Sequence, residues 1–250
     1  MNTTLVINPK GGSGKTTVTI NLASYFASCG IPTAVMDYDP HGSSLNWLRL
    51  RSPHAPKIHA ANAARHQGMQ LRSIAMYVPE QTEQLIIDAP AGATGLVLQE
   101  MLDRATCLIV PVPPSPIDIH ATANFVAEVL NSARMQSRRL PVAIVANKVR
   151  RSMPQYAPFD WFLSTLKLSL LARLVDSDVY VKAAEAGICI FEMEPGLALA
   201  ERRQFAPIVE WVESEPLFVA KPVASASRPA LHSVSSPAWR TASALPRITR

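Results

Sequence analysis

The chain of 250 residues is 48% hydrophobic and only 17% charged, which supplies a sizeable buried core and excludes a mainly disordered protein or a long coiled coil. It has no long uninterrupted apolar run and no basic, apolar leader, so we expect neither a membrane span nor a secretory signal and place it in the cytoplasm. The formal charge of +5 is concentrated near the C-terminus, because residues 221–250 hold basic residues but no acidic one.

The composition divides the chain into a domain over residues 1–215 and a tail over residues 216–250. The tail is rich in Pro, Ser and Ala and lacks a sustained apolar period, so we predict that it is disordered. Its basic residues form either a solvated extension or an arm that gains affinity for nucleic acid by releasing counterions. The three cysteines lie far apart in apolar sequence, which favours reduced core thiols over disulfides or a Cys-bound metal.

The chain opens with a short apolar strand at 3–8, a glycine-rich loop at 9–14 and a predicted helix at 18–27. Glycines allow consecutive backbone N–H groups to turn toward a phosphate, and the helix N-terminus adds partial positive charge. We expect Lys15 to reach the β- and γ-phosphates of a nucleotide and the Thr16 hydroxyl to bind Mg²⁺. The predicted nucleotide-binding residues of this loop are Lys10, Gly11, Gly12, Ser13, Gly14, Lys15, Thr16 and Thr17.

Further strands and helices alternate along the rest of the domain. The predicted strands are nearly continuous apolar runs, typical of strands buried on both faces, at 33–37, 84–88, 106–112, 142–147 and 171–175. Helices are predicted at 45–50, 67–77, 95–102, 119–138, 159–170, 179–186 and 197–213, the last kinked or divided at Pro207. This order predicts an α/β fold: a doubly wound, mostly parallel sheet with helices on both faces and ligands at the carboxyl ends of its strands.

Acidic residues end two of the predicted strands. Asp88 is suited to hold Mg²⁺ opposite Thr16; the alternative is that it only caps the following turn. Asp37 and Asp39 close an earlier strand and are directed to the same edge of the sheet. Hydrolysis of a phosphoanhydride depends mainly on positioning and charge, so we expect one of these two carboxylates to orient the attacking water.

Residues 10–17, KGGSGKTT, resemble the deviant Walker A motif of the ParA/MinD partition ATPases, a class of P-loop NTPases. Lys10 makes the resemblance specific, because an ordinary P-loop does not require a lysine at that position. Three segments follow in the family's order: residues 37–40 resemble its DxDPQ element, 86–92 its Walker B region, and 110–115 its next strand and loop. Asn147 and Lys148 resemble the strand end that contacts adenine. The resemblance covers about residues 2–213, and its one departure is His41, where the family usually has Gln.

The resemblance implies an ATPase of the small ParA type that hydrolyses ATP to ADP and phosphate with a slow basal rate. Its catalytic residues would be Lys10, Lys15 and Asp39, with Asp39 required for hydrolysis. Lys10 would reach the nucleotide of the partner subunit in an ATP-bound homodimer; alternatively it is a solvent-exposed loop lysine. Thr16, Asp88 and Asp39 would surround Mg²⁺.

Nonspecific DNA binding requires basic residues that face phosphates without reading bases. The candidates outside the loop are Arg150, Arg151, Arg173, Lys182, Arg202 and Arg203. For Arg202 and Arg203 the alternative is the solvated face of a helix, beside Glu201 and Glu210.

Three functions are compatible with these motifs. In the first, an ATP-dependent dimer binds double-stranded DNA of the nucleoid nonspecifically. A ParB-like or McdB-like adaptor then stimulates its ATPase, so that it segregates a plasmid or chromosome or positions a protein organelle such as the carboxysome. The second is a MinD-like membrane cycle for division-site placement, although we expect no stable membrane association because the C-terminus is weakly apolar and broken by Pro246. The third is a metabolic P-loop enzyme, such as a dethiobiotin-synthetase-like ligase or an iron-protein-like reductase.

Overall fold

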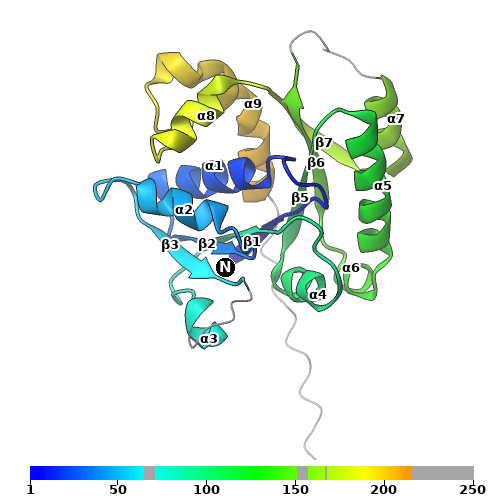
Figure 1. Cartoon of the computed structure of the whole chain (residues 1–250), viewed down its shortest axis with the longest axis horizontal. Coiled ribbons are helices and arrows are strands. Elements are labelled where there is room, and N and C mark those ends of the chain that lie inside the picture. The colour runs from blue at the N-terminus through cyan, green and yellow to red at the C-terminus, as the bar shows by residue number, and fades with distance from the viewer. Residues whose placement is uncertain (65–70, 151–156, 167, 215–250) are drawn as a thin grey trace, which may run out of the picture. The chain divides into compact units, whose positions relative to one another are not determined.

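The computed structural model describes residues 1–64, 71–150, 157–166 and 168–214. These residues form a seven-stranded sheet in the order β3-β2-β4-β1-β5-β6-β7, and every neighbouring pair of strands is parallel (Figure 1). The predicted α/β fold with a doubly wound parallel sheet is therefore confirmed. The predicted tail at 216–250 and the candidate Arg151 lie outside the described residues.

The strands are β1 Asn2–Val6, β2 Thr33–Asp37, β3 Ile58–Asn62, β4 Gln84–Asp88, β5 Cys107–Val112, β6 Val142–Val149 and β7 Ser169–Val175. The helices are α1 Lys15–Ser28, α2 Ser43–Leu50, α3 Arg72–Ala75, α4 Gly95–Arg104, α5 Pro116–Asn131, α6 Ala133–Arg138, α7 Ala157–Leu166, α8 Asp178–Glu185 and α9 Pro195–Ser214.

Two hydrophobic cores lie on opposite faces of the sheet, because successive residues of a strand point to opposite sides. Leu5 and Ile87 belong to the core that α4, α5, α6 and α7 cover. Val6 and Ile86 belong to the other core, which packs against α1 and α9. Figure 1 shows the corresponding layers, with α1, α2, α8 and α9 on one side of the sheet and α4 to α7 on the other. This arrangement leaves the edge with the strands' carboxyl ends open for ligands.

Three features of the fold differ from the sequence prediction. Strand β3 was not predicted, because at the edge of the sheet its residues, IHAAN, lack the continuous apolar run of a central strand. The helix predicted at 119–138 is two helices, since the Ser132 hydroxyl caps a new one by accepting from the Met135 N–H. The predicted break at Pro207 is wrong: the backbone leaves helical geometry at Ala198 (φ −131°), and α9 continues through Pro207, which is exposed.

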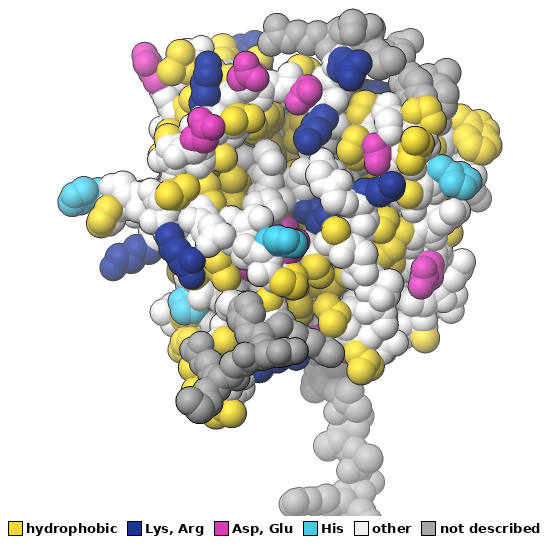
Figure 2. Space-filling model, viewed as in Figure 1, with side chains coloured by type: hydrophobic (Ala, Val, Ile, Leu, Met, Phe, Trp, Pro, Cys, Tyr) yellow, Lys and Arg dark blue, Asp and Glu magenta, His cyan; other side chains and the backbone are white. Residues whose placement is uncertain are grey.

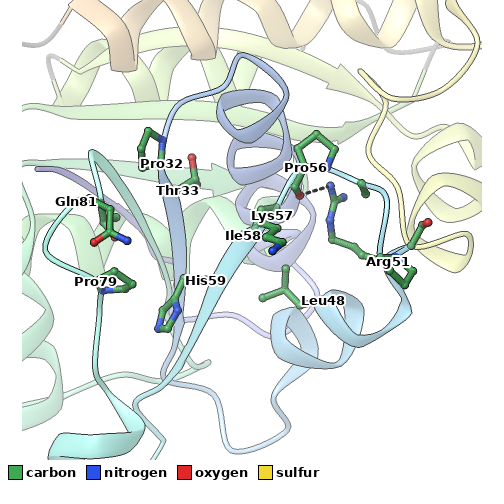
Figure 3. Close-up of a pocket in the computed structure, with 14 residues that line it drawn as sticks. Pro32, Thr33, Leu48, Arg51, Pro56, Lys57, Ile58, His59, Pro79 and Gln81 are labelled. Carbon is green, nitrogen blue, oxygen red and sulfur yellow. Dashed lines mark hydrogen bonds between the residues drawn. The ribbon is translucent and has the colours of Figure 1, made fainter.

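Cavities lie at both ends of the strands. A cavity of about 730 Å³ opens where β2 and β3 begin, at Thr33 and Ile58 (Figure 3). Cavities of about 320 and 370 Å³ adjoin the carboxyl end of β6, at Asn147 and Lys148. Within the described part of the chain, no helix combines the length and apolar character needed to cross a membrane.

Candidate functional site

The glycine-rich loop between β1 and α1 is held in place by two asparagines. The Asn8 side chain accepts from the Lys10 N–H at 2.8 Å, which turns the chain just after β1. The Asn147 amide, at the end of β6, donates to the Ser13 carbonyl at 2.8 Å. Gly14 has φ +92°, and a Cβ on it would lie 1.8 Å from the Asn147 amide nitrogen. Only glycine fits this position, so the loop conformation is built into the sequence.

The same loop forms a site for an anion. Helix α1 begins at Lys15 without a side-chain cap, so its first N–H groups remain available to a phosphate. The Lys15 side chain is buried, and its ammonium group donates to the Lys10 carbonyl at 3.0 Å. Burial lowers the pKa of Lys15, while the nearby carboxylates of Asp88 and Asp39 act in the opposite direction. A buried lysine beside open helix N–H groups is suited to bind nucleotide phosphates.

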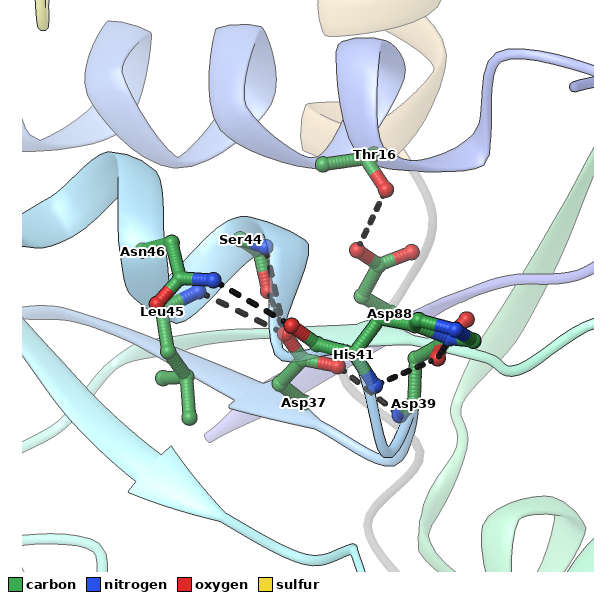
Figure 4. A network of polar contacts seen from close by, with 8 residues as sticks. All are labelled: Thr16, Asp37, Asp39, His41, Ser44, Leu45, Asn46 and Asp88. Atoms are coloured by element: carbon green, nitrogen blue, oxygen red, sulfur yellow. Dashed lines mark hydrogen bonds and ion pairs between the residues drawn. The ribbon is translucent and has the colours of Figure 1, made fainter.

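Thr16 and Asp88 form a pair that suits Mg²⁺. The Thr16 hydroxyl donates to Asp88 Oδ2 at 2.9 Å, and Asp88 is 1% exposed (Figure 4). Its second oxygen, Oδ1, is buried and has no hydrogen-bond partner among the residues that the structure describes. Burial, with a contribution from Asp37, raises the pKa of Asp88 to about 7. An orphaned carboxylate oxygen beside a hydroxyl and a phosphate site is the donor set that Mg²⁺ prefers, so the residues fit this metal.

The two aspartates at the end of β2, Asp37 and Asp39, have different surroundings (Figure 4). Asp37 is fully buried, and its Oδ2 accepts from the Ser44 N–H and hydroxyl at 3.1 and 2.6 Å, which caps α2. Its Oδ1 accepts from the Asp39 N–H at 2.8 Å. Asp39 is partly exposed, and its Oδ1 accepts from the His41 N–H and contacts His41 Nδ1 at 2.8 Å. Of the two carboxylates, Asp39 is therefore the one available to a bound water.

This contrast predicts different effects on stability. Asp37→Ala is expected to lower the free energy of unfolding by roughly 2–4 kcal/mol, because it leaves buried donors of α2 unsatisfied. Asp39→Ala is expected to change it by less than about 1 kcal/mol, because its partners reach water. Urea unfolding of both variants, followed by circular dichroism, measures the difference. Equal losses would mean that Asp37 is not the structural member of the pair.

The end of β6 borders a cavity of about 320 Å³ that also includes Thr17 of α1. Asn147 and Lys148, which the resemblance implies contact adenine, line this cavity, and Lys148 has the left-handed φ of +58°. Its other walls are formed by Val175, Asp176, Ser177, Tyr180, Val181, Ala184 and Glu185. Sequence reasoning missed Asp176 and Tyr180; their position after a predicted strand, at the start of a helix, was the available signal.

The candidate DNA-binding residues come from four elements. Three of them are exposed: Arg150 directly after β6, Lys182 on α8 and Arg203 on α9. Arg173 lies 5.9 Å from the ring of Phe159. Arg202 donates to the backbone carbonyls of Ile190 and Met193. In the view of Figure 2, Lys and Arg side chains alternate with acidic ones across the upper part of the face.

Comparisons with known proteins agree with this geometry. The model of the CobQ/CobB/MinD/ParA nucleotide-binding domain matches residues 4–187. The chain belongs to this family. The resemblance to ParA/MinD proteins that the loop motif predicted is thereby confirmed. The loop at residues 9–14 lies within the part of the chain that this nucleotide-binding domain covers.

Two of the proteins that are similar in sequence carry names that describe different roles. "Maintenance of carboxysome distribution protein A" (McdA) of Halothiobacillus neapolitanus is 24% identical over 196 residues, 76% of this chain and 87% of that protein. A cytosolic Fe–S cluster assembly factor of Danio rerio is 30% identical over 164 residues, 60% of this chain and 59% of that protein.

Solved structures show the shared fold. The cell division ATPase MinD of Pyrococcus furiosus has a TM-score of 0.65 at 18% identity, covering 85% of this chain and 98% of that one. An ATP complex of a McdA variant from Cyanothece has a TM-score of 0.62 at 15% identity, covering 88% and 98%.

Proposed function

We propose that the chain is an ATP hydrolase that dimerises with ATP, binds double-stranded DNA nonspecifically and positions a large cargo. The observation that carries the proposal is the glycine loop that opens with a second lysine, Lys10, next to the buried Lys15. We take this second lysine to favour a nucleotide-dependent dimer over a metabolic P-loop enzyme. The likeness to McdA, over most of both chains, favours cargo positioning, with the carboxysome as one candidate cargo.

The residues of the site divide the work of hydrolysis between them. Lys15 and the N–H groups of α1 bind the phosphates and offset the negative charge that develops during phosphoryl transfer. Thr16 and Asp88 would hold Mg²⁺, which would supply positive charge that neutralises the phosphates. Asp39 orients the attacking water, while Asp37 fixes the start of α2 behind it. With a single carboxylate, partly exposed, orienting the water, we expect a slow basal rate that an adaptor protein accelerates.

Lys10 couples ATP to dimerisation in this proposal. We expect Lys10→Ala to bind ATP with at most a severalfold loss and to remain monomeric with ATP, because charge stabilisation across the dimer is lost. Sedimentation velocity with ATP, in an Asp39→Ala background that prevents hydrolysis, measures the effect. Asp39→Ala alone is expected to accumulate as a long-lived dimer, and Lys15→Ala to bind no ATP. An ATP-dependent dimer of the Lys10→Ala, Asp39→Ala double variant would refute the role of Lys10.

DNA binding is the property to test first. We expect binding to unrelated duplex DNA with ATP but not with ADP or without nucleotide, and a steep decrease with salt because phosphate contacts release counterions. Lys15→Ala is the control that removes the nucleotide. Arg150→Glu, Lys182→Glu and Arg203→Glu are expected to weaken binding to all sequences alike. We leave Arg202 out of this set, because its guanidinium already serves two backbone carbonyls. Absence of DNA binding in every nucleotide state would contradict the proposal.

The similarity to Fe–S proteins favours a second function, the carrying of an iron–sulfur cluster. Such clusters are held by cysteine thiolates. Cys107 and Cys189 are buried, whereas Cys29 is exposed. The described residues of one subunit therefore do not bring these thiols together as ligands of a cluster. Reconstitution with iron and sulfide, followed by absorption spectroscopy, distinguishes the two proposed functions. A stable, stoichiometric cluster would support the iron–sulfur carrier, and the absence of a cluster would support the positioning ATPase.

A further inference from the structure

The outer edge of β3 is open. β3 is the last strand of the sheet and pairs only with β2 among the described residues. The Ala63 N–H donates to the Asp37 carbonyl of β2 at 2.8 Å. Because alternate residues of a strand point their backbone groups to the same side, Ala61 also faces β2, and Ala60 faces away from it. The N–H and C=O of Ala60 are thus directed to the open edge, where another strand can pair with them.

Two cavities flank this edge and meet at Leu48 and Ile58, which line both. The first is the cavity of about 730 Å³ at the start of β2 and β3; Figure 3 shows Leu48 of α2, Ile58 and His59 of β3, and Pro79 around it. The second, of about 450 Å³, lies between α2 and α3. The β3 residues that line the second cavity, Ile58, Ala60 and Asn62, share one face of the strand, so side chains of an added strand on that face have a place beside α2 and α3. We call this surface, from Leu48 and Ile58 along Ala60, the β3 groove.

The β3 groove is apolar and basic. Its lining residues include no Asp or Glu. Arg49 and Lys57 are exposed on it, whereas Arg51 is engaged with Glu192 at 2.7 Å. Figure 2 shows Lys and Arg side chains at the left margin of the face, where α2 and the loop to β3 lie. Ile74 on α3 is 61% exposed beside it. This combination attracts an extended segment that carries both acidic and apolar side chains.

We propose that the β3 groove binds an extended, acidic and apolar segment of a partner protein, which adds a parallel or antiparallel strand to β3. Backbone pairing at Ala60 supplies affinity, and the two cavities and the cations supply specificity. The chain's own residues 216–250 are the wrong occupant by charge, because they include five basic residues and no acidic one. This surface is separate from the phosphate loop, so the proposal does not depend on the nucleotide chemistry proposed above.

The decisive variant is Ala60→Pro, which removes only the N–H that faces the open edge and therefore keeps the pairing with β2. The full chain is used to select binders from a phage-displayed library of random short peptides. We expect acidic, proline-free peptides to be enriched and to bind Ala60→Pro about tenfold more weakly, because one backbone hydrogen bond is lost. A retained melting temperature shows that the variant is folded. No enrichment, or binding that Ala60→Pro leaves unchanged, would overturn the proposal.

Charge gives a second, independent readout. Arg49→Glu and Lys57→Glu are expected to weaken the selected peptides severalfold and to make binding less dependent on salt. Arg139→Glu, an exposed residue after α6, is the matched control and is expected to have no effect. Two results would overturn the proposal by showing another occupant of the β3 groove. Tighter peptide binding after deletion of residues 216–250 would mean that the chain's own C-terminal segment occupies it. A dimer of the full chain that Ala60→Pro dissociates would mean that a second copy of the chain does.

Discussion

Gly14→Ala is expected to lose nucleotide binding by at least about 100-fold while the rest of the domain stays folded. The left-handed φ of +92° is costly for alanine, and its Cβ would lie 1.8 Å from the Asn147 amide nitrogen. The clash pushes Asn147 off the Ser13 carbonyl, so the loop loses its brace and its N–H groups no longer converge on a phosphate. Titration with a fluorescent ATP analogue measures the affinity, and circular dichroism reports the fold.

Gly30→Ala is the matched control for this substitution. Gly30 has a similar φ of +77°, but nothing lies within 4 Å of its added Cβ. It therefore carries the backbone strain without the clash, and we expect a modest loss of stability with unchanged ATP affinity. Equal ATP affinity of Gly14→Ala and Gly30→Ala would show that the contact with Asn147 does not hold the loop.

Arg51→Ala is expected to cost roughly 3–5 kcal/mol of the free energy of unfolding, because it leaves a buried carboxylate without its partner. The Arg51 side chain is 6% exposed and that of Glu192 13% exposed, and two nitrogens of Arg51 donate to Glu192 at 2.7 and 2.9 Å. Arg51 also donates to Ser24 of α1 and lies over the Trp47 ring. Burial alone would raise the pKa of Glu192, but hydrogen bonds from Arg51, Ser24 and the Cys189 N–H, with the charge of Arg51, together outweigh it, and the pKa is lowered.

Chemical denaturation at neutral pH measures this loss. The double variant Arg51→Met, Glu192→Leu is expected to recover a large part of it, because both charges are removed and the packing is kept. A loss below about 1 kcal/mol for Arg51→Ala, in the range of an exposed pair, would show that the pair is solvated.

The parts of the molecule that sequence predicted are those with strong local signals. The loop at 9–14 follows a buried strand and precedes a helix, so its composition, its backbone geometry and its chemistry all indicate one structure. The central strands are uniformly apolar, and their carboxyl ends therefore predict that Asp88 lies near Thr16, as the hydrogen bond between them shows. The residues alone left open whether Asp37 or Asp39 faces the water, because both lie at the end of the same strand, and only the family resemblance pointed to Asp39.

The features that sequence did not predict depend on long-range contacts. The role of Asp37 requires Ser44 to lie over it, and the bracing of the loop requires Asn147, 134 residues from its partner Ser13. Strand β3 has half-polar residues because its position at the edge needs burial on only part of its surface. Likewise, Arg51 has no local signal that distinguishes it from a solvent-exposed arginine, and only its pairing with Glu192 reveals its burial.

Asn147 joins two halves of the nucleotide-binding region. The Asn147 amide donates a hydrogen bond to the Ser13 carbonyl of the loop, and the same residue lines the cavity at the end of β6. In the proposed nucleotide site, a base in that cavity and phosphates in the loop would thus be bound by one connected unit. The intact nucleotide then acts as a chelating ligand, in which either end, once seated, raises the effective concentration of the other. Free phosphate and free nucleoside should accordingly compete with ATP far more weakly than their separate contacts would suggest, and ATP and ADP should share most of their affinity.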